Sequence, residues 1–275
     1  MALVYHLAMK LIVVTPTLGS SLWLAETVRS VAALPFQVQH ILVAPGEVAP
    51  QLRASFPSTT IVEEAGTGMY AAINSGVAAG GNWDLLTYIN DDDTLLPGFR
   101  FAVGRAFLNR HLPFLAYGRV KLIDSAGKRI GIAPVSPFPA LNRALLAQGI
   151  DPLCQQGSVV TRSAWEQLGG YDTSLRLCSD FEFLARACLR GVHFHYVNRT
   201  VACFRLRPGQ LSKSRRQMED ERQRIDDNLQ LLTRKLTGRH LLTRAIFKAF
   251  NAGVYLERIA RHGFRSSSDL VSHLS

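Results

Sequence analysis

Three consecutive carboxylates near the middle of the chain are the residues best suited to chemistry. Asp91, Asp92 and Asp93 follow Asn90, directly after the mostly apolar run Leu85–Ile89, which predicts a buried strand. An open α/β sheet binds its ligand at the carboxyl ends of its strands, and carboxylates this close repel one another unless a cation joins them. Mg²⁺ or Mn²⁺ would relieve the repulsion and would fill its other sites with water and phosphate oxygens. The turn therefore predicts a metal site for a phosphate-bearing donor.

A simpler interpretation of this turn is also open. Asn and Asp are ordinary turn residues, and here they could cap the helix that Pro97 begins. Asp180 and Glu182 have the same two interpretations, because they lie in the first turn of a helix predicted over Asp180–Arg190. Carboxylates in that position stabilise the positive end of a helix. Position alone leaves both groups open between chemistry and capping.

Two pairs of residues give weaker indications. Gly66 and Gly68 precede a helix that begins near Met69, and they could cradle a phosphate or simply form a tight loop. His193 and His195 lie on one face of a predicted strand and could bind a metal. Two histidines without a third ligand are more often structural. Neither pair indicates a function by itself.

The elements around these residues predict an α/β fold. Lys10–Thr15 and His40–Ala44 are typical of parallel strands, and Leu22–Leu34 between them has apolar residues at helical spacing. The three predict a βαβ unit with a right-handed crossover. Later elements are predicted as a strand over Thr60–Glu63, a hairpin of Ala116–Ile123 and Arg129–Ile132, and a helix opened by a capping box at Ser163–Glu166. We expect a mostly parallel central sheet flanked by helices in residues 9–213, with residues 214–275 as a helical appendage.

The appendage is predicted to be basic and amphipathic. Residues 214–275 contain twelve Lys or Arg against seven Asp or Glu, about half of the net charge of +10. A helix from Leu241 to Ala260 has apolar residues at helical spacing and four basic ones, namely Leu242, Ile246, Ala249, Gly253, Leu256 and Ala260, with Arg244, Lys248, Arg258 and Arg261. Its apolar stripe is expected either to pack on the main domain or a second subunit, or to attach to an anionic membrane that presents a lipid-linked acceptor. Nucleic acid, which positive charge also suggests, is not the expected partner, and the oligomeric state is left open.

Composition indicates a globular, cytoplasmic protein, peripheral at the inner face of a membrane if the appendage attaches there. Hydrophobic residues make up 47% and charged residues 19%, and no apolar run approaches the roughly 18 to 20 residues that cross a bilayer. Met1–Ala8 lacks the features of a secretory signal and is interpreted as an extension, with Met9 as an alternative start. Four cysteines lack metal-ligand spacing and are expected to be reduced: Cys154, Cys178, Cys188 and Cys203.

Six short stretches follow one another between about Lys10 and Ser212: Val-Thr-Pro-Thr-Leu, Gly-Met-Tyr-Ala-Ala-Ile-Asn-Ser-Gly, Ile-Asn-Asp-Asp-Asp, Gln-Gln-Gly-Ser, Leu-Gly-Gly-Tyr-Asp and Ser-Asp-Phe-Glu-Phe-Leu-Ala-Arg. Their order and spacing resemble those of the family-two glycosyltransferases with the GT-A (Rossmann-like) fold. The resemblance implies a metal-dependent, hexosyltransferase-like enzyme of polysaccharide biosynthesis. It would move a sugar with inversion from a nucleotide-diphospho-sugar, expected to be a UDP-sugar, to a hydroxyl of a glycan or lipid-linked saccharide.

The resemblance also implies roles for individual residues. Asp92 and Asp93 would hold Mn²⁺ or Mg²⁺ against the diphosphate of the donor, and Asp180 would be the catalytic base. Donor contacts are implied for Pro16, Thr17 and Leu18 near the nucleobase, Gly68 and Asn74 beside the nucleotide, Asp92 at the diphosphate, and Gln156 near the sugar. A single base agrees with one inverting displacement.

Three places depart from the family's pattern. Ala44–Glu47 stands where relatives often have an Asp-rich turn, and Gly66 and Ala71 replace frequent aspartates. The identity of the donor therefore stays open, and a non-catalytic nucleotide-binding or membrane-binding homologue is an alternative. A nucleotidyltransferase-like enzyme is a second alternative, but it would normally carry a basic Gly-rich loop after the first strand. Pro16–Ser21 contains neither Lys nor Arg.

Overall fold

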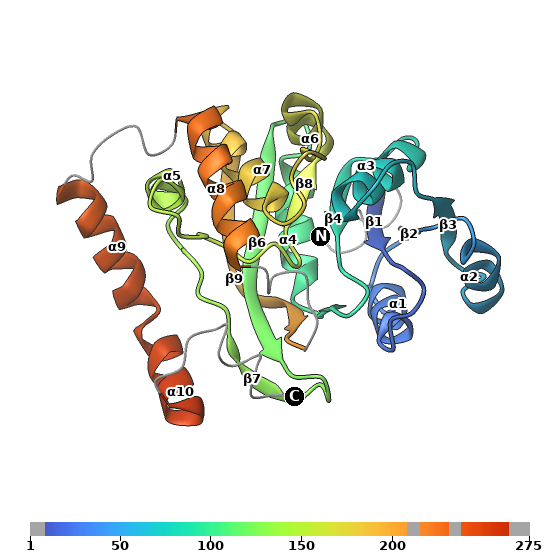
Figure 1. The fold of residues 1–275 in the computed structure, drawn as a ribbon, viewed down its shortest axis with the longest axis horizontal. Coiled ribbons are helices and arrows are strands. Elements are labelled where there is room, and N and C mark those ends of the chain that lie inside the picture. Colours follow the sequence, from blue (N-terminus) through green and yellow to red (C-terminus); the bar gives the residue numbers. More distant parts are fainter. Residues whose placement is uncertain (1–8, 208–214, 231–237, 264–275) are drawn as a thin grey trace.

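One mixed sheet of nine strands organises the chain in a computed structural model, which describes residues 9–207, 215–230 and 238–263 (Figure 1). The strands are β1 Leu11–Pro16, β2 Val38–Ala44, β3 Thr60–Glu63, β4 Leu85–Tyr88, β5 Thr94–Leu95, β6 Phe114–Ile123, β7 Arg129–Ile132, β8 Val159–Thr161 and β9 His193–Arg205. The helices are α1 Leu24–Ala32, α2 Ala49–Ser55, α3 Met69–Ala79, α4 Phe99–Leu108, α5 Asn142–Leu146, α6 Arg162–Leu168, α7 Ser179–Leu189, α8 Arg215–Leu229, α9 Gly238–Phe250 and α10 Ala252–His262, with a 3₁₀ turn, η2, at Pro139–Leu141.

The first half of the sheet is parallel, as the sequence predicts. β1 pairs with β2 on one side and with β4 on the other, and β3 extends the sheet beyond β2. The predicted βαβ unit of the first 45 residues is confirmed, because α1 connects the parallel strands β1 and β2. α3 packs closely on these strands at Gly76, where an added Cβ would lie 2.6 Å from Val14 and 2.7 Å from Val43. The carboxyl ends of β1, β2 and β4 therefore share one edge.

The second half of the sheet adds antiparallel pairs to the predicted parallel ones, so the α/β sheet as a whole is mixed. β8 lies between β4 and β6 and is antiparallel to both. β5 pairs antiparallel with β9, and β7 pairs antiparallel with β6. β6 and β9 are parallel. β5 and β8 have only two and three residues, too few for hydrophobic periodicity to identify them. α2 was likewise not predicted, and residues 133–152 contain η2 and α5.

One predicted cap is wrong by two residues. Ser163 was expected to open a helix, but α6 begins at Arg162, and the side chain of Thr161 accepts a hydrogen bond from the Ala164 amide at 3.3 Å. Thr161 is also the last residue of β8, and its Oγ1 donates to the carbonyl of Leu112 at 2.7 Å. The same residue therefore ends the strand and caps the helix.

The C-terminal helices lie against the main body at its outer side (Figure 1). The helix predicted over Leu241–Ala260 is two helices, because Asn251 separates α9 from α10. Asn251 is buried and holds Val135 by two hydrogen bonds, one to its amide and one to its carbonyl, each of 3.0 Å. Within the described ranges, no helix has the length and apolar character to cross a bilayer. The predicted extension over residues 1–8 and the predicted domain boundary at 213 lie outside the described residues, so both stay predictions.

Candidate active site

The acidic turn lies at the carboxyl end of β4, and Asp93 anchors it. Asp93 is fully buried, and its Oδ1 accepts a hydrogen bond of 2.8 Å from the Arg205 amide. Its Oδ2 accepts one of 3.0 Å from Nε2 of Gln156. Burial raises the pKa of Asp93 well above its usual range, the charge of Asp92 raises it further, and these hydrogen bonds oppose both effects. Asp93 thus joins the turn to the end of β9 and to the segment before β8.

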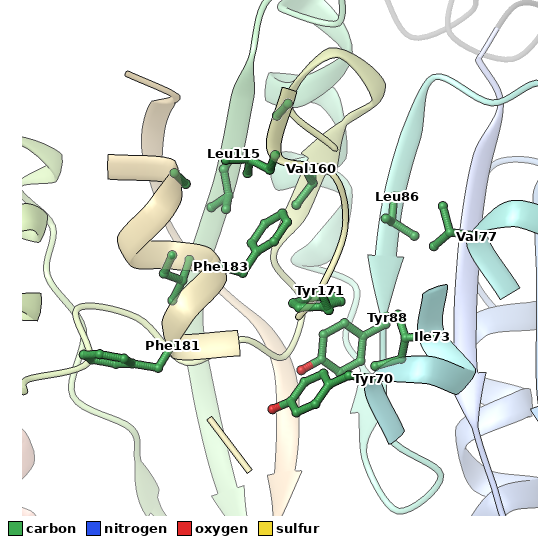
Figure 2. Close-up of a cluster of buried hydrophobic side chains, with 14 of the residues drawn as sticks. Tyr70, Ile73, Val77, Leu86, Tyr88, Leu115, Val160, Tyr171, Phe181 and Phe183 are labelled. Carbon is green, nitrogen blue, oxygen red and sulfur yellow. The ribbon is translucent and has the colours of Figure 1, made fainter. Parts of the chain in front are cut away.

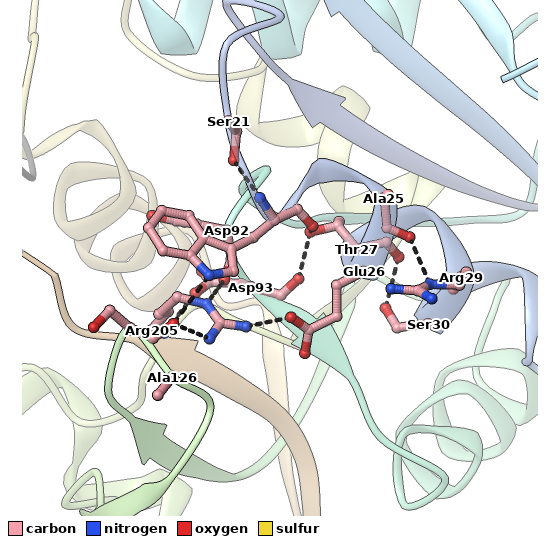
Figure 3. A network of polar contacts seen from close by, with 12 residues as sticks. Ser21, Ala25, Glu26, Thr27, Arg29, Ser30, Asp92, Asp93, Ala126 and Arg205 are labelled. Atoms are coloured by element: carbon pink, nitrogen blue, oxygen red, sulfur yellow. Dashed lines mark hydrogen bonds and ion pairs between the residues drawn. The ribbon is translucent and has the colours of Figure 1, made fainter. Parts of the chain in front are cut away.

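The buried side chain of Arg205 binds the acidic turn and two neighbouring segments (Figure 3). Its guanidinium donates to the Asp92 carbonyl at 2.9 Å and to the Glu26 carboxylate at 2.7 Å. It also donates to the carbonyls of Asp124 and Ser125 in the β6–β7 hairpin, at 3.2 and 3.3 Å. Sequence reasoning missed this residue. The sequence feature that could have identified it is an arginine at the end of a strand, directly after apolar residues.

Arg207 binds the turn from the side. Its Nε donates to Asp92 Oδ2 at 2.6 Å, in an ion pair whose Asp92 side chain is only 6% exposed. The guanidinium carbons of Arg205 and Arg207 lie 5.2 and 5.4 Å from the ring centroid of Trp23, within cation–π distance. Neither Arg207 nor Trp23 was predicted as a site residue. Asp92 therefore has a guanidinium partner before any ligand binds.

The loop after β1 reaches the same turn. Thr17 donates from its hydroxyl to Asp91 Oδ2 at 2.6 Å, and Ser21 donates to the Asp91 carbonyl at 2.8 Å. Burial raises the pKa of Asp91, and the hydrogen bond from Thr17 opposes this rise. Pro16 is the last residue of β1, and the side chain of Leu18 is 70% exposed. The loop is therefore held by Thr17 while Leu18 points to solvent.

Cation binding can be tested against these contacts. Among the residues that the structure describes, no group of three or more His, Cys, Asp or Glu is placed to hold a metal ion. Both carboxylate oxygens of Asp93 accept hydrogen bonds from the protein, whereas Asp92 is already paired with a cationic side chain. The turn therefore fits a divalent ion only if a ligand supplies further oxygens, which is how Mg²⁺ is usually bound.

His195 has the structural role that the sequence left open as an alternative. His195 accepts a hydrogen bond of 3.0 Å from Arg105, and its ring stacks on Phe114 with centroids 6.2 Å apart. Burial lowers the pKa of His195, and the charge of Arg105 lowers it further. His193 lies at the start of β9 and is exposed. Packing beside the sheet therefore accounts for His195.

Asp180 lies in the first turn of α7 and has the properties of a base. Its Oδ1 accepts hydrogen bonds from the Tyr70 hydroxyl at 3.1 Å and from the Phe181 amide at 2.8 Å. Burial raises the pKa of Asp180 to about 6, and the charge of Asp151 adds to the rise. The side chain is only partly buried. At neutral pH most molecules therefore carry an ionised Asp180 that is basic enough to accept a proton.

Glu182 has a different environment from Asp180. It forms an ion pair with Arg186, with Nη2 and Oε2 2.6 Å apart, and both side chains are largely buried. The same guanidinium donates to the carbonyl of Gly170 at 2.9 Å and to that of Leu168. Glu182 therefore orients Arg186, which fixes the end of α6 and the following loop to α7, and this is a structural role.

An aromatic cluster connects the base to the strand that carries the acidic turn (Figure 2). The ring of Tyr171 lies 5.4 Å from those of Tyr70 and Tyr88 and 4.8 Å from that of Phe183. Tyr88 is the last residue of β4, Tyr70 belongs to α3 and Phe183 to α7. These contacts fix Asp180 relative to the end of β4.

The segment before β8 lies between the two acidic groups. The Cys154 thiol donates to Gln156 Oε1 at 2.8 Å, and Gln156 donates in turn to Asp93. Burial raises the pKa of Cys154, and the charges of Asp93 and Asp180 both add to the rise. Both carboxylates are therefore close enough to Cys154 to affect its ionisation.

The remaining predicted donor contacts are on α3. Gly68 precedes the helix with φ of 94°, in the region that favours glycine, and an added Cβ there would meet no atom within 4 Å. Asn74 donates to the Tyr171 carbonyl at 2.8 Å, and its Oδ1 accepts from the Tyr171 amide at 3.0 Å. The backbone before α3 is therefore open to a ligand, while the amide of Asn74 is used within the protein.

The structure thus brings most of the predicted residues to one edge of an α/β sheet. Thr17, Asp92, Asp93 and Gln156 meet at the acidic turn, and Asp180 is connected to it through the aromatic cluster. Asn74 is turned toward Tyr171 and Leu18 toward solvent. The fold is that of the GT-A class, as the sequence resemblance implied.

Solved structures of S. aureus TarS share this fold. One TarS structure aligns with a TM-score of 0.60 and 14% identity over 95% of this chain and 45% of the TarS chain, so this chain spans less than half of that chain's length. TarS 1-349 in complex with UDP-GlcNAc aligns with a TM-score of 0.60 and 14% identity over 92% of this chain and 73% of the other. A second structure of TarS 1-349 aligns with a TM-score of 0.59 and 14% identity over 92% of this chain and 72% of the other. No protein-family model matches the sequence, and no curated protein sequence matches it.

Proposed function

We propose that this protein is an inverting glycosyltransferase that uses a nucleotide-diphospho-sugar. The observation that carries the proposal is Asp180, a partly exposed carboxylate whose pKa is raised to about 6 and which is connected to the end of β4 through Tyr70 and the aromatic cluster. Support also comes from the fold, which TarS 1-349 shares, and that protein has been solved in complex with UDP-GlcNAc. A UDP-sugar is therefore the first donor to test.

The donor's diphosphate would bind at the acidic turn. Arg207 places a guanidinium there, and guanidinium groups bind phosphate oxygens well. Thr17 and the open backbone at Gly68 lie at the same edge, on the sides proposed for the nucleoside. Asp92, with Asp93 behind it, would hold Mn²⁺ or Mg²⁺ together with the diphosphate, and the ion would stabilise the charge that develops on the leaving group.

Asp180 would act on the acceptor. An acceptor hydroxyl attacks the anomeric carbon from the side opposite the diphosphate, so the new C–O bond forms as the bond to the diphosphate breaks. Asp180 takes the hydroxyl proton, and the nucleoside diphosphate leaves with the bonding electrons. Such general-base catalysis typically contributes about 10²- to 10⁴-fold. The acceptor is proposed to be a hydroxyl of a glycan or lipid-linked saccharide.

A panel of UDP-sugars, with glycan and lipid-linked acceptors, tests this proposal through release of UDP. Transfer should require the acceptor and should fail with Asp180→Asn while UDP binding, measured by calorimetry, persists. UDP binding without transfer by any donor and acceptor would favour a non-catalytic homologue, the alternative that the altered turn at Ala44–Glu47 suggests. Absence of UDP binding with and without Mn²⁺ would contradict the proposed donor site.

A further inference from the structure

α10 is oriented with its apolar side outward. Glu257, at the edge of that side, pairs with Arg129 of β7 at 2.8 Å and with Arg261 at 3.0 Å. Leu256 is 66% exposed and Ile259 36% exposed. A surface helix normally buries its apolar residues, whereas α10 leaves Leu256 and Ile259 exposed.

α9 continues the exposed apolar surface. Its buried side chains, Thr243 and Phe247, face the body, whereas Leu241 and Leu242 are 62% and 61% exposed. We use the name outer face for exposed apolar residues of the two helices, namely Leu241, Leu242, Ala245, Ala249, Ala252, Gly253, Leu256, Ile259 and Ala260. Phe250 of α9 is also exposed but is left out of this set, because its ring contacts that of Phe138. Figure 1 shows both helices on the outside of the molecule. Among the large apolar side chains that the structure describes as exposed, five of twelve belong to α9 and α10, which marks this region as an interaction surface.

The charge of the two helices favours an anionic surface over a second copy of the chain as the partner of the outer face. Residues 238–263 contain five Lys or Arg and one Asp or Glu, a difference of +4. Arg244 and Lys248 are exposed on α9, and Arg261 is exposed on α10. A symmetric contact between two copies would bring two such positive regions together, which is unfavourable. An anionic surface would instead be attracted by the basic residues and would accept the leucines.

We propose that the outer face attaches the protein to an anionic lipid bilayer. α9 and α10 would lie in the plane of the membrane surface, with the leucines among the acyl chains and the basic side chains among the lipid headgroups. The helices are held to the protein by the buried side chains of Thr243 and Phe247, by the Asn251 contacts to Val135 and by the ion pair between Glu257 and Arg129. The outer face can therefore bind lipid without unpacking from the main body.

The position of α10 gives this attachment a connection to the candidate active site. α10 packs on β7, and the β6–β7 hairpin contributes the carbonyls of Asp124 and Ser125 that bind Arg205. The guanidinium of Arg205 binds the Asp92 carbonyl in turn. The β6–β7 hairpin would therefore connect the bilayer-binding helix α10 to the acidic turn.

Co-sedimentation of the full chain with vesicles tests the proposal. Vesicles of phosphatidylcholine with about half phosphatidylglycerol should bind the protein at low salt, and binding should weaken at least tenfold as salt rises and with pure phosphatidylcholine. The double variant Leu242→Glu/Leu256→Glu should lose at least tenfold in binding. Both residues are exposed, so folding should be unaffected, which far-UV circular dichroism would verify.

A matched variant separates the outer face from charge alone. Leu108→Glu/Leu112→Glu makes the same change at two other exposed leucines, 57% and 47% exposed, and should bind vesicles like the parent chain. Equal loss in both double variants would overturn the proposal, as would absence of parent binding to the anionic vesicles. If sedimentation shows a dimer that only Leu242→Glu/Leu256→Glu dissociates, the outer face would bind a second copy of the chain, which would contradict the proposal. Binding by a chain ending at Gly263, but not by the full chain, would assign it to residues 264–275 and equally contradict the proposal.

Discussion

The hydroxyl of Tyr70 and the carboxylate of Asp180 lie 3.1 Å apart, although 110 positions separate them in the chain. Tyr70 also donates toward the Leu177 carbonyl at 3.2 Å, so one hydroxyl is shared between the base and the loop that precedes it. Tyr70 is therefore the residue through which α3 affects the protonation of Asp180.

Asp180→Asn should abolish transfer while preserving UDP binding. The amide keeps the size of the carboxylate but cannot accept the acceptor's proton, so kcat should fall by about 10²-fold or more. Glu182→Gln is the matched control, because Glu182 is paired with Arg186 and should affect stability more than transfer. An active Asp180→Asn with an inactive Glu182→Gln would exchange the two roles.

The same substitution should stabilise the fold at neutral pH. The folded protein raises the pKa of Asp180 from 3.8 to about 6, so the protonated form contributes stability below pH 3.8 that is lost as pH rises through 6. Because Asn does not ionise, the variant should not lose this stability, and its free energy of unfolding at pH 7.5 should exceed that of the parent chain by on the order of 1 to 3 kcal/mol. Thermal unfolding at pH 7.5 and at pH 3.5 measures it, and a gain that is as large at pH 3.5 would contradict the explanation.

The pH profile should report Asp180 and respond to Tyr70. In the parent chain, kcat/KM should rise with unit slope in log scale up to about pH 6 and then level off, because the base must be ionised. Tyr70→Phe removes a hydrogen bond that stabilises the ionised form, so the inflection should move upward by about half to one pH unit. Tyr196→Phe, on β9, should leave it in place. A downward shift in Tyr70→Phe would refute this assignment.

Arg207→Gln should make nucleotide binding more dependent on metal. The substitution removes the guanidinium proposed to bind the diphosphate, so UDP affinity in EDTA should fall by roughly tenfold. It also frees the Asp92 carboxylate for a divalent ion, so Mn²⁺ should restore more affinity than in the parent chain. Calorimetric titration of UDP with Mn²⁺ and with EDTA gives the ratio. An unchanged ratio would show that Arg207 and the ion do not compete for Asp92.

Gly68→Ala should destabilise the fold by about 1 to 2 kcal/mol, because φ of 94° is unfavourable for alanine although space is available. Gly104→Ala is the control, since Gly104 lies inside α4 with an ordinary helical backbone and free space around it. That substitution should stabilise by about 0.5 to 1 kcal/mol. Urea unfolding of both variants measures the difference, and an equal response would mean that the backbone at Gly68 relaxes.

The sequence predicted the elements whose pattern is local. β1, β3, β4 and the hairpin were found because their apolar runs and turn residues are contiguous. β5 and β8 were missed because two or three residues are specified by their neighbours in space rather than by their own periodicity. The division of α9 from α10 was missed for the same reason, since Asn251 ends the helix by binding Val135, far away in the chain.

The candidate site was predictable only in part. Asp91 to Asp93 and Asp180 belong to recognisable local motifs, so their types and positions were sufficient. Arg205 and Arg207 were missed because their importance comes from contacts across more than 110 positions, to Asp92. The orientation of the outer face was also beyond sequence, because helical spacing gives a stripe but does not say which side the body covers.

Arg205 also determines how the chain opens. One buried guanidinium holds α1 through Glu26, the acidic turn through Asp92 and the hairpin through Asp124, while its own amide is bonded to Asp93. Each of these segments would remove a hydrogen bond from this buried guanidinium if it detached alone, so they should form a single cooperative unit in hydrogen–deuterium exchange. The Arg205 amide should exchange only when the whole unit opens. The acidic turn would then be among the last parts of the sheet edge to lose protection, although it lies next to an exposed loop.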